Sequence, residues 1–77
     1  MDKVEEINDN DTPNNLPEAM EKQIERNREL LEIYKTIPTG GFGATMIAHD
    51  IREGIAALAS GDVIRILRSY ASLKGNE

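Results

Sequence analysis

Ile37-Pro38-Thr39-Gly40-Gly41-Phe42-Gly43-Ala44-Thr45 decides the fold, because this stretch separates two segments with helical periodicity. A proline disfavours helical geometry in the residue before it, so the first helix is expected to end at Ile37. Three glycines permit a tight turn and a close approach to bare N–H donors. Two interpretations stay open: a plain helix–helix turn, or an anion-binding site where the next helix begins.

The first helix is predicted over residues 16–37. Its expected start is Asn15-Leu16-Pro17-Glu18, with Asn15 as the cap, Pro17 in the first turn and Glu18 completing a box-like pattern. A stripe with steps of four and three residues runs along this helix and is typical of a packed helical seam. Its members are Met20, Ile24, Asn27, Leu31 and Tyr34. Asn27 is either a polar residue that sets the register of the seam or a solvated side chain.

The second helix is predicted over residues 44–59. With Gly43 as its N-cap, Phe42 and Ile47 have the spacing of a hydrophobic staple. Gly54 lies at the edge of the apolar stripe, where it permits a close helix contact. Ser60-Gly61-Asp62 is typical of a glycine stop followed by an aspartate cap, and it predicts a third helix over residues 62–73. The inward side chains of that helix are expected to be Val63, Ile66, Leu67, Tyr70 and Leu73, with Arg65, Arg68, Ser69 and Ser72 outward.

The expected fold is therefore all-α, a helical hairpin plus a third short helix. A chain of 77 residues buries a modest share of its surface, and no cysteine is present to form a disulfide. Association between copies is a common remedy, so we expect a homo-oligomeric helical bundle. Its interface is predicted to use Met20, Ile24, Asn27, Leu31, Tyr34 and Gly54.

Residues 1–15 form an acidic segment with five carboxylates and one lysine, a net charge of −4 within a chain of net charge −5. Too few apolar residues are present to offset the entropy of ordering, so we expect a disordered tail. It either solubilises the protein or orders on a basic partner. No secretion signal and no apolar run of membrane-spanning length is recognised, which favours a cytoplasmic protein without membrane contact.

The glycine stretch is the strongest candidate for a ligand site. N–H groups at a helix N-terminus favour anions, threonine hydroxyls donate to phosphates, and aromatic rings stack on bases. The residues assigned to this site are Tyr34, Thr39, Gly40, Gly41, Phe42, Gly43, Thr45, His49 and Arg52. The alternatives are a structural turn and a protein-contact tip with Phe42 as its anchor.

Other chemistry finds little support in the residues. One histidine does not make a metal site, and no nucleophile or carboxylate pair lies in a catalytic context, so we expect no enzyme activity, no metal and no cofactor. Arg65 and Arg68 on the third helix fit a helix-turn-helix DNA-binding regulator, but the acidity of the chain argues against nucleic acid as a partner.

A set of short stretches resembles short phage and prophage proteins of uncharacterised function. These stretches are Tyr34, Ile37-Pro38-Thr39-Gly40, Gly43-Ala44-Thr45-Met46-Ile47, Ala59-Ser60-Gly61-Asp62-Val63 and Tyr70. The resemblance implies a protein that occupies a host molecule. The function we expect is sequestration, by a non-enzymatic oligomer, of a phosphorylated nucleotide-like ligand such as a host defence signal. The alternative is an inhibitor or scaffold that acts on a host protein.

Overall fold

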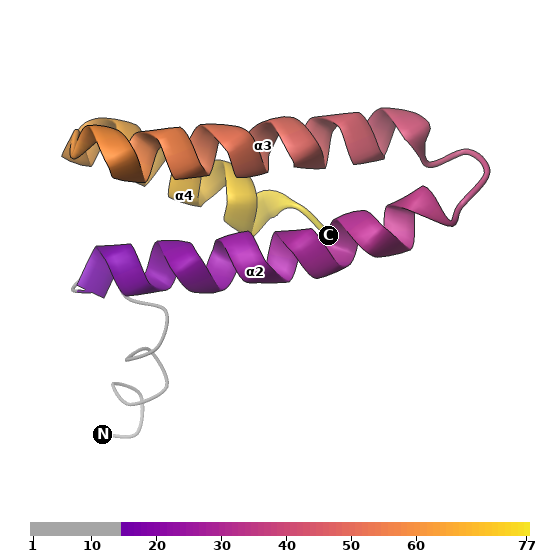
Figure 1. Cartoon of the computed structure of the whole chain (residues 1–77), viewed down its shortest axis with the longest axis horizontal. Coiled ribbons are helices and arrows are strands. Elements are labelled where there is room, and N and C mark those ends of the chain that lie inside the picture. The colour runs from indigo at the N-terminus through magenta and orange to yellow at the C-terminus, as the bar shows by residue number, and fades with distance from the viewer. Residues whose placement is uncertain (1–14) are drawn as a thin grey trace, which may run out of the picture.

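A computed structural model describes residues 15–77, and this part of the chain forms three helices without a strand. Labelled as in Figure 1, they are α2 (Leu16–Lys35), α3 (Gly41–Ser60) and α4 (Val63–Gly75). α2 and α3 form an antiparallel hairpin, and α4 returns along it from the end opposite the hairpin turn. The all-α prediction is confirmed. The disorder predicted for the acidic segment falls on residues 1–14, outside the described part.

The ends of α2 follow the sequence with two differences in detail. The helix begins at Leu16 as expected, but the Asn15 side chain does not cap the backbone; its Nδ2 donates to Glu18 Oε1 at 2.6 Å. α2 ends at Lys35, before the predicted Ile37. Thr36 closes the last turn through its N–H and its hydroxyl, both of which donate to Ile33 O. The proline therefore ends the regular helix earlier, because Ile37 itself cannot be helical.

The α3–α4 corner is as predicted. Gly61 ends α3 in the left-handed conformation, with φ of +72°, which glycine adopts without a steric penalty. Asp62 then caps α4, because its Oδ1 accepts hydrogen bonds from the N–H groups of Ile64 (3.0 Å) and Arg65 (3.2 Å). α4 runs to Gly75, two residues beyond the predicted end.

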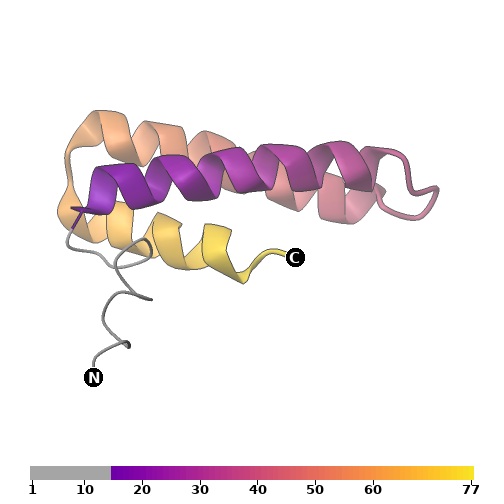
Figure 2. The same cartoon turned by 90° about the horizontal axis from the view of Figure 1, so that it is seen from below.

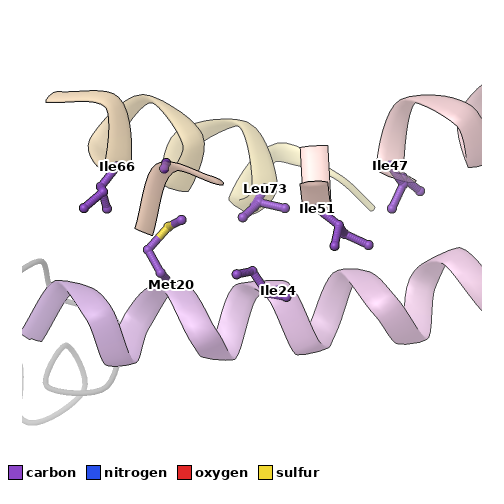
Figure 3. Packing of buried hydrophobic residues seen from close by; sticks show 7 residues of the cluster. Met20, Ile24, Ile47, Ile51, Ile66 and Leu73 are labelled. Atoms are coloured by element: carbon purple, nitrogen blue, oxygen red, sulfur yellow. The ribbon is translucent and has the colours of Figure 1, made fainter. Parts of the chain in front are cut away.

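The core lies where the three helices meet (Figure 3). Met20 of α2 points toward α4, between Ile66 and Leu73, and Ile24 of α2 lies next to Leu73 and Ile51 of α3. The buried apolar set is completed by Ile47, Ala57 and Ile66. Gly54 is buried at the crossing, where an added Cβ would lie 3.1 Å from Leu73 Cδ1 and 3.5 Å from Ile24 Cγ1. The predicted role of Gly54 in a close helix contact is confirmed, and the contact is made within one chain.

The inward side of α4 differs from the prediction. Val63 and Leu67 are exposed, whereas Ser69, which was expected outward, is buried. The Oγ of Ser69 lies 3.2 Å from the position of a Cβ on Gly54. The absence of a side chain on Gly54 draws α4 in on the Ser69 side and turns Val63 and Leu67 toward solvent.

Polar side chains fasten the end of α4 to the hairpin. Asn27, fully buried in α2, donates from Nδ2 to Leu73 O (3.1 Å) and to Gln23 O (2.8 Å), and its Oδ1 accepts from Asn76 Nδ2 (2.9 Å). Arg26 donates to the same Leu73 O at 2.8 Å. These bonds satisfy carbonyl groups that a helix C-terminus leaves unpaired. Asn27 is therefore a buried register-setting residue, and it acts between helices of one chain.

Candidate functional site

The hairpin tip comprises the last turn of α2, residues 36–40 and the first turn of α3. It projects beyond the end of α4, as both views show (Figures 1 and 2). Gly40 N–H donates to Ile37 O at 2.9 Å and closes the turn. This part of the hairpin therefore consists of two helices without a third to cover it.

α3 begins three residues before its predicted start, and this changes the role of the glycine stretch. Gly40 is the N-cap, in place of the predicted Gly43, and Gly41, Phe42 and Gly43 form the first turn of the helix. Glycine costs about 1 kcal/mol in a helix interior, which is why the sequence favoured a loop here. Packing against Tyr34 overrides that preference.

Tyr34 lies directly against two of the glycines. A Cβ on Gly43 would lie 2.5 Å from Tyr34 Cε2, and a Cβ on Gly40 would lie 2.5 Å from Tyr34 O. The Tyr34 hydroxyl donates to the backbone oxygen of Glu77, which holds the ring in place. Gly41, in contrast, has no atom within 4 Å of an added Cβ. Two of the three glycines thus have a packing role, and one does not.

The N-terminus of α3 is open. Gly40 supplies no side-chain cap, and the first backbone bond of the helix runs from Ala44 N–H to Gly40 O at 2.8 Å. The N–H groups of Gly41, Phe42 and Gly43 precede that bond, so no helical carbonyl accepts from them. Their partial positive charge faces the solvent at the tip, where it favours an anion.

Phe42 lies on this same turn and is 81% exposed. The predicted hydrophobic staple is therefore wrong: Ile47 is buried, and five helical residues separate the two side chains by about 140° around the axis. No part of residues 15–77 covers this side chain. Such exposure is informative where it belongs to a contiguous apolar patch.

Three more large apolar side chains are exposed in or next to the hairpin tip: Ile33 (56% exposed), Ile37 (42%) and Met46 (47%). Ile33 lies two turns after Arg26, and Met46 one turn before Asp50, and both of these polar residues bond the end of α4. The four residues Ile33, Ile37, Phe42 and Met46, named here the tip patch, therefore continue the α4-facing side of the hairpin beyond α4.

The remaining residues assigned to the ligand site lie farther from one another. Thr39 is exposed in the turn, and Thr45 is exposed on α3, where its hydroxyl donates to Gly41 O at 3.0 Å. His49 and Arg52 are exposed along the same side of α3. At 1.5 Å per residue, Arg52 lies about 16 Å along the axis from Gly41. One chain brings Tyr34, Gly40, Gly43 and Phe42 together and leaves His49 and Arg52 apart from them.

The residues assigned to an oligomer interface lie mainly inside the single chain. Met20, Ile24, Asn27 and Gly54 are buried, and Leu31 and Tyr34 are half-buried against the same core. The apolar stripe predicted for α2 thus packs against α3 and α4 in the core of one chain. An interface between copies remains a prediction, and surface residues must supply it.

A groove of about 430 Å³ between α3 and α4 contains the arginines considered for DNA. Arg65 forms a bidentate pair with Glu53, at 2.7 and 3.1 Å. The hydrogen bonds from Arg65 lower the pKa of the Glu53 carboxyl, and they raise the pKa of the guanidinium. Arg65 is thus engaged within the fold, while Arg68 is exposed on α4.

Within residues 15–77, no group of three histidine or acidic side chains is placed to hold a metal ion. None of the described helices combines the length and apolar character that crossing a bilayer requires. No protein-family model, curated protein or solved structure matches this chain.

Proposed function

We propose that this protein is a non-enzymatic binding protein that captures a phosphorylated, nucleotide-like ligand at the tip of its hairpin. One observation carries the proposal: three unpaired N–H groups and an exposed aromatic ring occupy the same turn of α3. Backbone N–H groups at a helix N-terminus bind phosphate, and an aromatic ring stacks on a base. The phosphate of a nucleotide thus matches the N–H groups, and its base matches the Phe42 ring, within a few residues of one another.

The hydroxyl of Thr39 adds a donor beside this turn, since it is exposed and lies directly before the N-cap. His49 and Arg52 are too far along α3 to reach the same phosphate from within one chain. The capture proposed here therefore uses the tip residues of one chain. The resemblance to phage and prophage proteins favours a host defence signal in the cytoplasm as the captured ligand.

The test is calorimetric titration with a panel of cyclic di- and trinucleotides. Loss of one base-stacking contact costs about 1–3 kcal/mol, so Phe42→Ala should weaken binding about tenfold or more. Thr39→Val removes only a hydroxyl and should cost less. Ile64→Ala is the matched control, because Ile64 is also a large apolar residue that is exposed (58%), but it lies in the first turn of α4 at the other end of the molecule. Absence of heat for the whole panel would remove this function.

A second candidate, a protein partner, is favoured by the tip patch. Ile33, Ile37 and Met46 extend the apolar surface well beyond a single stacking ring. An amphipathic helix that continues the line of α4 would cover all four side chains. Aromatic anchors carry a large share of such binding energy, so this partner would be a host protein held by Phe42.

Capture from bacterial lysate separates the two candidates. A stoichiometric protein retained by the unaltered chain and by Ile64→Asp, but lost with Met46→Asp, favours the protein partner. Nucleotide binding that survives Met46→Asp and fails with Phe42→Ala favours ligand capture.

A further inference from the structure

The outer side of α3 carries an apolar stripe that residues 15–77 cover only in part, with Ala44 and Ala48 half-buried. Ala44, Ala48, Ile55 and Ala59 follow one another at spacings of four, seven and four residues, which places them on one side of the helix. Ile55 is 45% exposed, and Ala59 is exposed. α3 therefore presents apolar side chains beyond those that its own fold buries.

α2 completes this surface on the face of the hairpin away from α4. A groove of about 330 Å³ runs between the two helices, with Ile24, Ile55 and Leu58 as its apolar lining. Glu21, Glu25 and Arg28 form its rim on α2. Arg28 follows Arg26 by two residues, so it points about 200° away from the side that bonds α4.

The charges around this groove are complementary to those of the same groove on a second copy of the chain. The α2 rim carries Glu21, Glu25 and Arg28, a net charge of −1, while the exposed charge beside the α3 stripe is Arg52. None of these four side chains forms an ion pair or hydrogen bond with residues 15–77. In a two-fold pair each subunit presents the same patch, so a basic edge on one helix meets the acidic edge on the other.

We propose that this groove and the apolar stripe of α3 bind a second copy of the chain. The two α3 helices pack against each other through Ala48 and Ile55, and Arg52 of each protomer pairs with the acidic rim of the other. Alanines permit helix axes to approach to about 8 Å. The interface is independent of the ligand proposed at the tip.

Area and charge favour a second copy over other occupants. A hairpin of two 20-residue helices presents a face about 30 Å by 20 Å, on the order of the ~800 Å² per partner that specific interfaces bury. The acidic N-terminal segment of the same chain is disfavoured, because its net charge of −4 would meet the carboxylates of the rim.

Sedimentation equilibrium of the full chain tests the proposal directly. The protein should dimerise at micromolar concentration, and Ile55→Lys should weaken the dimer at least tenfold. Ile64→Lys is the control and should leave the dimer unchanged, since Ile64 is more exposed than Ile55 but lies on α4. Circular dichroism establishes that both variants stay helical.

A charge exchange tests the pairing itself. Arg52→Glu, and separately Glu21→Lys with Glu25→Lys, should each weaken self-association about tenfold, because like charges then face each other. Mixed together, the two variants should form a heterodimer at least as tight as the unaltered dimer.

Three results would overturn the proposal. They are a monomer at millimolar concentration, a dimer that Ile55→Lys leaves intact, and a mixture of the two charge variants that stays monomeric. A dimer lost with Phe42→Asp but kept with Ile55→Lys would assign self-association to the tip patch. Ligand binding at the tip is measured separately, so neither outcome decides the proposed function.

Discussion

Replacing Asn27 with alanine should remove more than half of the stability of this domain. The side chain is fully buried and makes three hydrogen bonds: to Gln23 O at 2.8 Å, to Leu73 O at 3.1 Å and from Asn76 Nδ2 at 2.9 Å. At about 1 kcal/mol for each bond, Asn27→Ala should lower the free energy of unfolding by about 3 kcal/mol. Small domains have about 5 kcal/mol in total.

The partners of Asn27 limit this loss. Leu73 O keeps its bond from Arg26 Nη2, and Asn76 Nδ2 keeps its bond to Asp50 Oδ2 at 2.9 Å. No buried group is therefore left without a partner, and the larger penalty for an orphaned polar atom does not apply.

Urea unfolding followed by far-UV circular dichroism measures the effect. With a slope of about 1 kcal/mol/M, the midpoint should fall by roughly 3 M while the slope stays constant. The protomer concentration is held fixed, because self-association would contribute to the apparent stability. Asn15→Ala is the control: its exposed side chain bonds only Glu18, and it should cost less than about 0.5 kcal/mol. An equally small loss for Asn27→Ala would refute the role of this side chain in fastening α4.

The two adjacent glycines of the hairpin turn should respond oppositely to alanine. Gly40→Ala places a Cβ 2.5 Å from Tyr34 O and should cost about 1–3 kcal/mol, whereas Gly41→Ala meets no atom within 4 Å and should be neutral or stabilise by up to about 1 kcal/mol. Thermal unfolding compares them, and equal melting temperatures would contradict the packing described for Tyr34. The Glu53–Arg65 pair makes stability depend on pH, because the folded state lowers the pKa of the Glu53 carboxyl. Its contribution is complete above the ordinary glutamate pKa and is lost as the pH falls through the lowered value; Glu53→Gln should therefore destabilise at neutral pH and differ little in acid, and a difference independent of pH would argue against the pair.

Local signals in the sequence predicted the number of helices and the corner between α3 and α4. Gly61 and Asp62 act on their own neighbours, so their roles can be recognised without knowledge of the fold. The start of α3 was missed, because glycine has a low intrinsic helix propensity and the compensating contact comes from Tyr34 of another helix.

Neighbouring residues in the sequence do not decide whether a polar residue in an apolar stripe is buried within the chain or exposed. Asn27 fits an interface between copies as well as a buried position, and its acceptor on another helix, Leu73 O, is 46 residues away in sequence. Ser69 likewise has the pattern of an outward residue, and only the bare backbone of Gly54 on the opposing helix explains its burial. The open turn of α3 was predicted as a candidate site, whereas the surrounding tip patch depends on where α4 ends.

The attachment of the last residues to the hairpin decides where a purification handle should be placed. Tyr34 binds the backbone of Glu77, so anything fused after Glu77 leaves the protein beside the hairpin, on the side toward the α2–α3 turn. Such a fusion would shield Phe42 and its neighbours from whatever they bind. A handle joined through the N-terminal segment avoids this, because α2 begins at the opposite end of the hairpin.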